Sequence, residues 1–349
     1  MKALAVLCVR NEAAFLIEWL AHHRAVGFTD FLVFSNDCQD GTDILLDRLQ
    51  DMGEVQHIRN DGPYDKRGIQ FTALKIAEKL PIVAEADWIL PLDVDEFVNI
   101  KTGGHQLVDL FAALPDADAI ALTWRLFGNA GKVRYDDLPV TDQFRQAAPE
   151  VLFWPWRASM FKTLYRNSGV YKKLGVHRPR SPDPDRVEDQ NWFDGEGRAL
   201  DAKYKTKRIF SNFGRSNTAL VQLNHYPLGA MESYVLKADR GRAVHSSDLL
   251  GVDYWIERNF NQETDTSIDA LKPERAAIAA GLMTDDTLAK LHAAAVNWRK
   301  ARFDALMLQE PFRALFGRLL MTPPSRLVPQ KAASFMMRYA NTARKTAKN

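Results

Sequence analysis

Short apolar runs and amphipathic stretches alternate regularly over the first hundred residues, and few folds are compatible with that pattern. The apolar runs have the length of buried strands and lie at residues 3–9, 31–34, 54–58 and 88–92. Between them, apolar residues recur at helical spacing in 15–27, 41–52 and 69–80. Such alternation predicts a doubly wound, mostly parallel α/β sheet. Ligands of these sheets bind at the carboxyl ends of the strands.

The composition excludes several classes of protein. Apolar residues make up 46% of the 349 residues and charged residues 26%, as in globular rather than disordered or fibrous proteins. No stretch approaches the roughly 18–20 apolar residues that cross a bilayer. The apolar start runs into Arg10-Asn11-Glu12 without a small-residue cleavage site, which indicates a strand and a cytoplasmic protein. Two cysteines, Cys8 and Cys38, are too few for a disulfide framework and fit a reducing compartment.

The chain beyond residue 115 is less regular and shows no internal repeat. Strand-like and helix-like segments can still be recognised there: the former at 117–124, 151–161 and 219–226, the latter at 231–240 and 285–308. Within the first part, Pro91 is unusual in a central strand because proline lacks the N–H that a strand ladder needs. We therefore expect that strand to leave the sheet near Pro91.

The clearest chemical signal is Asp93-Val94-Asp95, directly after the predicted strand at 88–92. Two carboxylates one residue apart offer the hard oxygen ligands that Mg²⁺ and Mn²⁺ prefer. Such an ion takes further ligands from water and substrate phosphates. Asp-x-Asp triplets also occur in solvated turns, and the position after a buried strand is what favours a metal site here.

Other strand and helix ends carry groups suited to a nucleotide. The first predicted strand is followed by Arg10, Asn11 and Glu12, and the second by Asp37. The third predicted helix is preceded by Lys66 and Arg67, and its free N–H groups suit a phosphate. Taken singly, each is better explained as a turn or a helix cap. Because the carboxyl ends of parallel strands meet at one edge of the sheet, their joint position predicts a nucleotide crevice.

An ordered set of motifs over about residues 3–245 resembles the family 2-type glycosyltransferases, most closely the branch related to family 92. Its segments are, in chain order, Cys8-Val9-Arg10-Asn11-Glu12, Glu18-Trp19, His22-His23 before Gly27-Phe28, Phe34-Ser35-Asn36-Asp37, Asp40-Gly41-Thr42, Trp88 with Asp93-Val94-Asp95-Glu96-Phe97, and Asn224-His225-Tyr226 with Ser233, Lys237 and Arg240-Gly241. The resemblance implies a GT-A fold. It also implies transfer of a sugar from a nucleotide-diphosphate donor with the help of Mn²⁺ or Mg²⁺.

The resemblance also implies roles for individual residues. Asp93 would contact the ribose or the metal, Asp95 would ligate the metal, and His225 would complete the metal site. Lys237 would neutralise the diphosphate. His177, in a segment that is also similar to the family, would face the acceptor or the diphosphate, or replace His225 as the ligand. Each of the two histidines and Lys237 has an ordinary structural alternative, as a buried or surface residue.

The general base and the acceptor are harder to place. In the family pattern an acidic pair follows the metal site, and Glu188-Asp189 is the adjacent pair in the proline-rich stretch 179–191, although its local context departs from that pattern. An inverting transfer would need such a base. Trp154 and Trp156 suit the faces of acceptor sugars or the protein core. We expect a UDP-sugar donor and a glycan or lipid-linked acceptor.

The expected organisation is a GT-A domain over 1–245, with a nucleotide-binding half over 1–100 and an acceptor half over 101–245. A helical extension over 246–322 and a basic tail over 323–349 follow. From Pro311 onward there are eight basic and no acidic residues, whereas the rest is mildly acidic, which does not suggest nucleic-acid binding. The tail predicts either peripheral contact with anionic lipid at the inner face of the membrane, or a helix on the body with a frayed end.

Two other functions remain open. Asp93-x-Asp95 after a strand is also typical of haloacid-dehalogenase-type phosphatases, but those enzymes have threonine or valine where this chain has Phe97. A catalytically degenerate glycosyltransferase that serves as a binding module is the second alternative, and Asp93, Asp95 and His225 argue against it.

Overall fold

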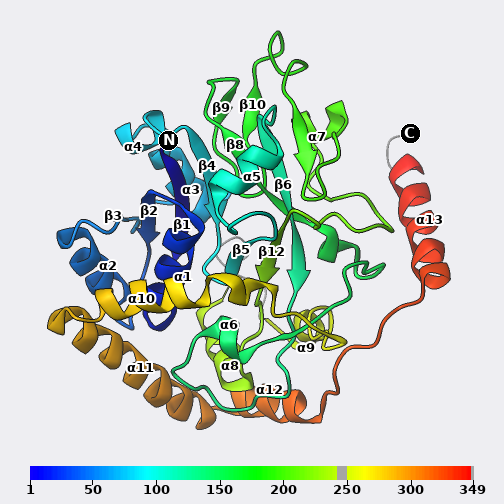
Figure 1. Ribbon diagram of the computed structural model, residues 1–349. Helices are drawn as coiled ribbons and strands as arrows, with labels where there is room; N and C mark the ends of the chain where they lie inside the picture. The colour runs from blue at the N-terminus through cyan, green and yellow to red at the C-terminus, as the bar shows by residue number, and fades with distance from the viewer. Residues whose placement is uncertain (242–249, 347–349) are drawn as a thin grey trace.

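One large sheet organises the structure (Figure 1), a computed structural model that describes residues 1–241 and 250–346. Within these residues nine strands belong to it. In spatial order they are β3 (Gln56–Arg59), β2 (Asp30–Ser35), β1 (Ala3–Val9), β4 (Trp88–Leu92), β8 (Phe161–Arg166), β6 (Ala119–Leu126), β12 (Val221–His225) and β5 (Glu96–Ile100), with β11 (Trp192–Asp194) paired to β6. Among the described strands of this sheet, only β8 and β5 run antiparallel to their neighbours. The predicted fold class, a GT-A-like, doubly wound and mostly parallel α/β sheet with C-terminal helices, is confirmed.

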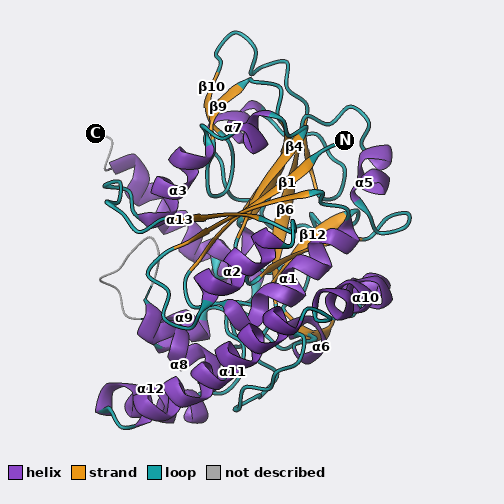
Figure 2. Cartoon of the chain, turned by 90° about the vertical axis from the view of Figure 1, so that its left-hand side faces the viewer, coloured by secondary structure: helices purple, strands orange, loops and turns teal. Residues whose placement is uncertain are grey.

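Helices cover both faces of the sheet (Figure 2). One core cluster joins strand residues to helices that include α1 (Ala13–Val26), α2 (Thr42–Asp51) and α5 (Leu107–Ala113). The other joins strand residues to α3 (Ile69–Ala77), α4 (Pro81–Ala84) and α7 (Ala202–Thr206). The predicted strands and helices of the first hundred residues are thereby confirmed. The short pairs β9 (Tyr171–Lys173) with β10 (Arg180–Pro182), and β7 (Gln146–Ala147) with β13 (Glu263–Thr264), lie outside the sheet.

The later helices cover the first face and the lower end of the molecule in the view of Figure 1. They are α6 (Val140–Gln143), α8 (Met231–Arg240), α9 (Val252–Ile256), α10 (Lys272–Leu282), α11 (Asp286–Met307) and α12 (Glu310–Met321), whereas α13 (Gln330–Thr346) lies elsewhere. Both α10 and α11 pack on α1, and α11 also reaches α2 and α8. After Pro323-Pro324 the chain runs to α13, which Figure 1 shows apart from α10–α12.

Helix α1 fixes the position of β5, the strand that directly follows Asp95. The indole N–H of Trp19 donates to the Glu96 carbonyl over 3.2 Å. Nε2 of His22 lies 2.8 Å from the Val98 carbonyl oxygen, and burial lowers the pKa of His22 to about 3, so its ring is neutral. The motif residues of α1 therefore act by holding the strand beside the Asp-x-Asp segment.

Two local expectations had different outcomes. Pro91 pairs with Val6 of β1, while the pairing of β4 with β8 covers only Trp88 and Ile89, so Pro91 stands where β4 has already left β8. The prediction of a strand over 151–161 is wrong, because Trp156–Ser159 forms a 3₁₀ turn and strand β8 begins only at Phe161. Trp154 and Trp156 consequently do not share one face of a strand.

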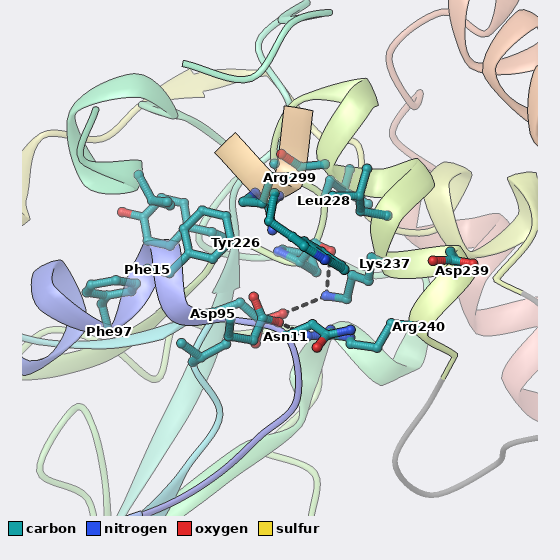
Figure 3. Close-up of a pocket in the computed structure, with 18 residues that line it drawn as sticks. Asn11, Phe15, Asp95, Phe97, Tyr226, Leu228, Lys237, Asp239, Arg240 and Arg299 are labelled. Atoms are coloured by element: carbon teal, nitrogen blue, oxygen red, sulfur yellow. Dashed lines mark hydrogen bonds and ion pairs between the residues drawn. The ribbon is translucent and has the colours of Figure 1, made fainter. Parts of the chain in front are cut away.

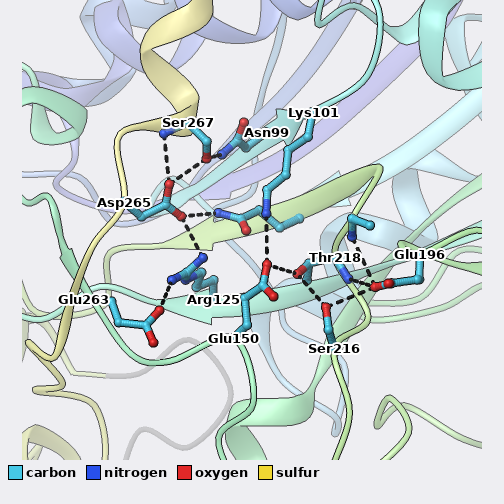
Figure 4. A network of polar contacts seen from close by, with 12 residues as sticks. Asn99, Lys101, Arg125, Glu150, Glu196, Ser216, Thr218, Glu263, Asp265 and Ser267 are labelled. Carbon is cyan, nitrogen blue, oxygen red and sulfur yellow. Dashed lines mark hydrogen bonds and ion pairs between the residues drawn. The ribbon is translucent and has the colours of Figure 1, made fainter.

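A polar network ties the segment after α9 to the far edge of the sheet (Figure 4). The Asp265 carboxylate accepts hydrogen bonds from Ser267 and from Gln222 of β12, and it pairs with Arg125 of β6 at 3.1 Å. The hydroxyl of Ser267 accepts from Asn99 of β5 over 2.7 Å. Residues of three strands are thus linked to one carboxylate.

No helix in the described ranges has both the length and the apolar character needed to span a bilayer. The expected domain boundary between residues 245 and 246 lies outside the described residues, as does Lys348 of the basic tail. The division of the chain into domains therefore stays a prediction.

Candidate functional site

A cleft of about 560 Å³ lies at the carboxyl edge of the sheet, where β1, β4 and β12 end. Seven residues predicted from the sequence line it together: Arg10, Glu12, Asp93, Asp95, His177, His225 and Lys237. They come from segments that are up to 227 residues apart in the chain and meet because parallel strands end at one edge.

Asp93 lies over a buried ion pair. Nζ of Lys162 is 2.9 Å from an Asp93 oxygen and 3.4 Å from an oxygen of Glu96, and the side chains of Lys162 and Glu96 are fully buried. Gln70 donates a further hydrogen bond to Asp93 over 3.1 Å. Burial raises the pKa of Glu96 to about 8, although Lys162 opposes the shift. This pairing holds the Asp93 carboxylate at a set position on the cleft wall.

Asp95 faces a lysine and a histidine. Nζ of Lys237 lies 2.7 Å from one carboxylate oxygen (Figure 3), and Nε2 of His225 lies 3.7 Å from the other. Burial opposes the ionisation of Asp95, but Lys237 and His225 outweigh it and hold the pKa of this carboxyl well below its usual range. Burial lowers the pKa of His225, so the imidazole is neutral and has a lone pair available.

Trp124 contacts Glu96 and the two histidines of the cleft. Its indole N–H donates to Glu96 over 2.7 Å, and its ring lies 4.3 Å from the His225 ring and 5.7 Å from the His177 ring, centre to centre. Burial and the nearby Lys162 charge lower the pKa of His177 to about 4, so this ring is also neutral. Both imidazoles therefore pack against one partly buried tryptophan.

Cations surround the carboxylates. Arg240 of α8 pairs with Glu12 and donates to the Arg10 carbonyl, while Arg10 donates back to the Arg240 carbonyl over 3.3 Å. Arg258 also lines the cleft, and its guanidinium stacks on Tyr254 at 3.6 Å. An excess of fixed positive charge in a concave site favours an anionic ligand such as a diphosphate.

The remaining predicted residues lie elsewhere. Asn11 lines a smaller cavity beside the cleft and accepts a hydrogen bond from the Gln39 N–H. The others are not among the described residues that line the cleft: Asp37, bonded to Tyr64; Lys66, exposed; Arg67, paired with Asp65; and Glu188 and Asp189, both exposed. Asp37, Lys66 and Arg67 therefore do not line the cleft with the Asp-x-Asp segment, as their predicted joint position would require. Glu188 and Asp189, the pair that the family pattern suggests as the base, do not line it either.

Sequence reasoning missed several residues of the site. Lys162 stands inside the otherwise uncharged run Phe161–Tyr165, and a charge within a buried strand was a usable signal. Glu96 was named only as part of a motif, and Arg258 carried no signal. Within the described residues, no group of three or more His, Cys, Asp or Glu side chains lies close enough to hold a metal ion.

Comparisons with known proteins identify the family. The model of glycosyltransferase family 92 matches residues 5–194, more than half of the chain. A family 92 protein of Oryza sativa subsp. japonica is 27% identical over 150 residues, covering 41% of this chain and 24% of that protein. One of Ricinus communis is 30% identical over 98 residues, covering 27% and 16%. The matched stretches thus span a quarter or less of these relatives.

Solved structures show more distant similarity. S. aureus TarS in complex with UDP-GlcNAc has 16% identity and a TM-score of 0.33, covering 82% of this chain and 74% of that one. The galactosyltransferase LgtC, in complex with donor and acceptor sugar analogs, has 21% identity and a TM-score of 0.23, covering 34% and 46%. It is the family model that decides the assignment: this chain belongs to glycosyltransferase family 92.

Proposed function

We propose that this chain is a glycosyltransferase that moves a sugar from a nucleotide-diphosphate donor, with UDP as the expected nucleotide, to a glycan or lipid-linked acceptor. The observation that carries the proposal is the single cleft in which Asp93 and Asp95 stand among Arg10, Lys237 and Arg240. Membership of the family supports the reaction class. The family match gives no support to the phosphatase alternative.

The cations of the cleft bind the donor diphosphate in this proposal. Lys237 and Arg240 lie on α8, and each already contacts a carboxylate, so both are held in place before the donor arrives. Charge builds up on the leaving nucleotide diphosphate in the transition state, and fixed cations stabilise that charge without reorganising. Asp93, fixed by Lys162 and Gln70, is placed to accept a hydrogen bond from a ribose hydroxyl.

Asp95 and His225 fit the divalent metal that the family resemblance implies. An anionic oxygen of Asp95 and Nε2 of the neutral His225 imidazole face each other at 3.7 Å, which is too far for a hydrogen bond between them. A cation between them would satisfy both groups, its remaining ligands coming from water and phosphate. Bound Mn²⁺ or Mg²⁺ would supply Lewis-acid stabilisation of the leaving diphosphate.

We further propose direct displacement at the anomeric carbon by an acceptor hydroxyl, which inverts the configuration. The exposed Glu188-Asp189 pair lies outside the cleft lining and is not proposed as the base. We also propose that the cleft residues Arg10 and Glu12 contact the nucleotide of the donor.

Titration calorimetry with UDP, GDP and their sugars, with and without Mn²⁺, tests the proposal. We expect metal-dependent binding of one nucleotide to wild type and its loss in Asp95→Asn, which keeps the shape but removes the charge. Asp43→Asn is a matched control, because Asp43 pairs with Arg59 outside the cleft. Nucleotide binding without transfer from any donor sugar would favour the degenerate binding module. No binding of any nucleotide would contradict the proposal.

Helix α13 supports a second proposal, peripheral contact with anionic lipid at the cytoplasmic face of a membrane. Phe335 and Tyr339 are 52% and 65% exposed one turn apart, and Lys331 and Arg338 lie on the same helix. Apolar side chains combined with cations are typical of helices that lie in the headgroup region.

A further inference from the structure

A second cavity of about 70 Å³ lies beside Asp95 and Lys237, enclosed by residues of α1, α8 and α11 (Figure 3). We call it the inner cavity. Its walls are largely aromatic and aliphatic, and include Phe15, Phe97, Tyr226, Leu228, Leu236 and Trp298. Glu12, Asp95, Lys237 and Arg240 line both this cavity and the donor cleft, so the two spaces adjoin.

Arg299 of α11 lines the inner cavity and is only 5% exposed. Its guanidinium lies over two rings, 4.5 Å from the centre of Phe15 and 4.8 Å from that of Tyr135. Its buried Nε has no hydrogen-bond partner, and no carboxylate of the described residues forms an ion pair with it. In the part of the chain that the structure describes, the direct contacts of the guanidinium are those with the two rings.

The other charges around the cavity are balanced. Glu12 pairs with Arg240, Asp95 pairs with Lys237 at 2.7 Å, and Asp239 forms two hydrogen bonds with Arg302 at 2.8 and 2.9 Å. Each carboxylate that lines the cavity therefore has its own cation. Among the described residues Arg299 is left without an ion-pair partner in a largely apolar space, and the Asp40 carboxylate attracts it only at longer range. A buried guanidinium is costly unless an anion pairs with it directly.

We propose that Arg299 recognises a carboxylate on the sugar substrate, so that the transferred sugar is a hexuronic acid. This inference rests on the proposed function. One carboxylate carries the single negative charge that balances one guanidinium, and its two oxygens match the planar fork of arginine. The inner cavity has room for such a group, while the sugar ring and the diphosphate occupy the adjoining cleft. The same chemistry would serve a uronic acid in the acceptor.

Matched donors that differ only at C6 test the inference by calorimetry: UDP-glucuronate against UDP-glucose, UDP-galacturonate against UDP-galactose, and, if GDP is the nucleotide bound, GDP-mannuronate against GDP-mannose. We expect wild type to bind one uronate at least about tenfold more tightly than its neutral partner. Arg299→Met should abolish that difference while leaving the affinity for the unsubstituted nucleoside diphosphate unchanged. Arg48→Met is the control, because Arg48 pairs with Asp285 away from both cavities.

Methyl glucuronide and methyl glucoside, titrated in the presence of the nucleotide, separate the two sources. Preference for the glucuronide that depends on Arg299 assigns the carboxylate to the acceptor and supports the shared chemistry. Nucleotide binding with no Arg299-dependent preference among donors or acceptors overturns the inference and leaves the proposed function standing. Absence of nucleotide binding overturns both.

Unfolding in urea provides a readout that is independent of any ligand. Since the Arg299 charge is unpaired in the free protein, Arg299→Met should be at least as stable as wild type. A clear loss of stability would assign the residue a structural role through its ring contacts and count against the inference. If Arg299→Met does not fold, Arg299→Lys, which keeps the charge but loses the fork, should still show a reduced uronate preference.

Discussion

Lys162 has no access to solvent, yet it contacts Asp93, which lines the candidate cleft. Lys162 contacts Asp93 and Glu96, and each contact spans more than 60 residues of sequence. No local pattern could reveal this pairing, because it depends on the antiparallel register of β8 beside β4. By contrast, Asp93 and Asp95 could be predicted, because their signal lies in three consecutive residues after a strand.

Replacing Lys162 with Met should destabilise the protein by about 3 kcal/mol, since it leaves the buried Glu96 carboxyl and the partly exposed Asp93 carboxylate without their cation. Urea denaturation of wild type and variant measures the difference. Lys101→Met is the matched control, because Lys101 pairs with the partly exposed Glu150 at 3.5 Å and should cost less than about 1 kcal/mol. Equal losses in the two variants would contradict the assigned importance of the buried pair.

Glu18 on α1 gives a pH-dependent prediction. Burial raises the pKa of its carboxyl above the usual 4.5, although hydrogen bonds from Val140 and Thr141 oppose the shift. The folded state thus binds more protons than the unfolded state above pH 4.5, and its stability falls as pH rises through that window. Glu18→Gln should remove this part of the decline.

Urea unfolding at several pH values between 4.5 and 7.5 measures the effect. The difference in unfolding free energy, wild type minus Glu18→Gln, should decrease as the pH increases. A difference that is constant over this range would show that Glu18 titrates alike in the folded and unfolded states.

At the scale of elements, periodicity predicted most helices and strands of the first half, because each packs one regular face on the sheet. It failed at 151–161, where an apolar and aromatic composition suits a strand and a 3₁₀ turn equally well. It also left the end of the chain open, and α13 is a helix there rather than a frayed end.

The role of α13 can be tested with charge variants. Lys331→Gln together with Arg338→Gln should weaken binding to phosphatidylglycerol vesicles by roughly 30-fold at low salt, at about 1 kcal/mol per cation. Co-sedimentation measures the bound fraction. Lys203→Gln with Lys207→Gln makes the same charge change at α7 and should have little effect. Equal weakening in both variants would show a general charge effect and argue against a docking helix.

At the scale of the whole molecule, donor binding joins α1, α8 and the sheet around one cleft and should stabilise all of them together. Nucleotide with Mn²⁺ at about 100 times its dissociation constant should raise the free energy of unfolding by about 2.7 kcal/mol. Thermal unfolding with UDP, and with UMP as a control that lacks the second phosphate, measures this. We expect no stabilisation of Asp95→Asn by UDP. Equal stabilisation by UMP and UDP would argue against recognition of the diphosphate.

The position of β12 has a consequence for synthesis on the ribosome. β5 follows Asp95 directly, yet its sheet partner is β12, which itself lies between β5 and β6. A nascent chain that has emerged only as far as residue 200 therefore has its Asp-x-Asp segment but no neighbour for the strand behind it. Arg299 emerges later still. The order of translation thus keeps the cleft incomplete until Arg258 has left the exit tunnel, and the inner cavity incomplete until Arg299 has left it.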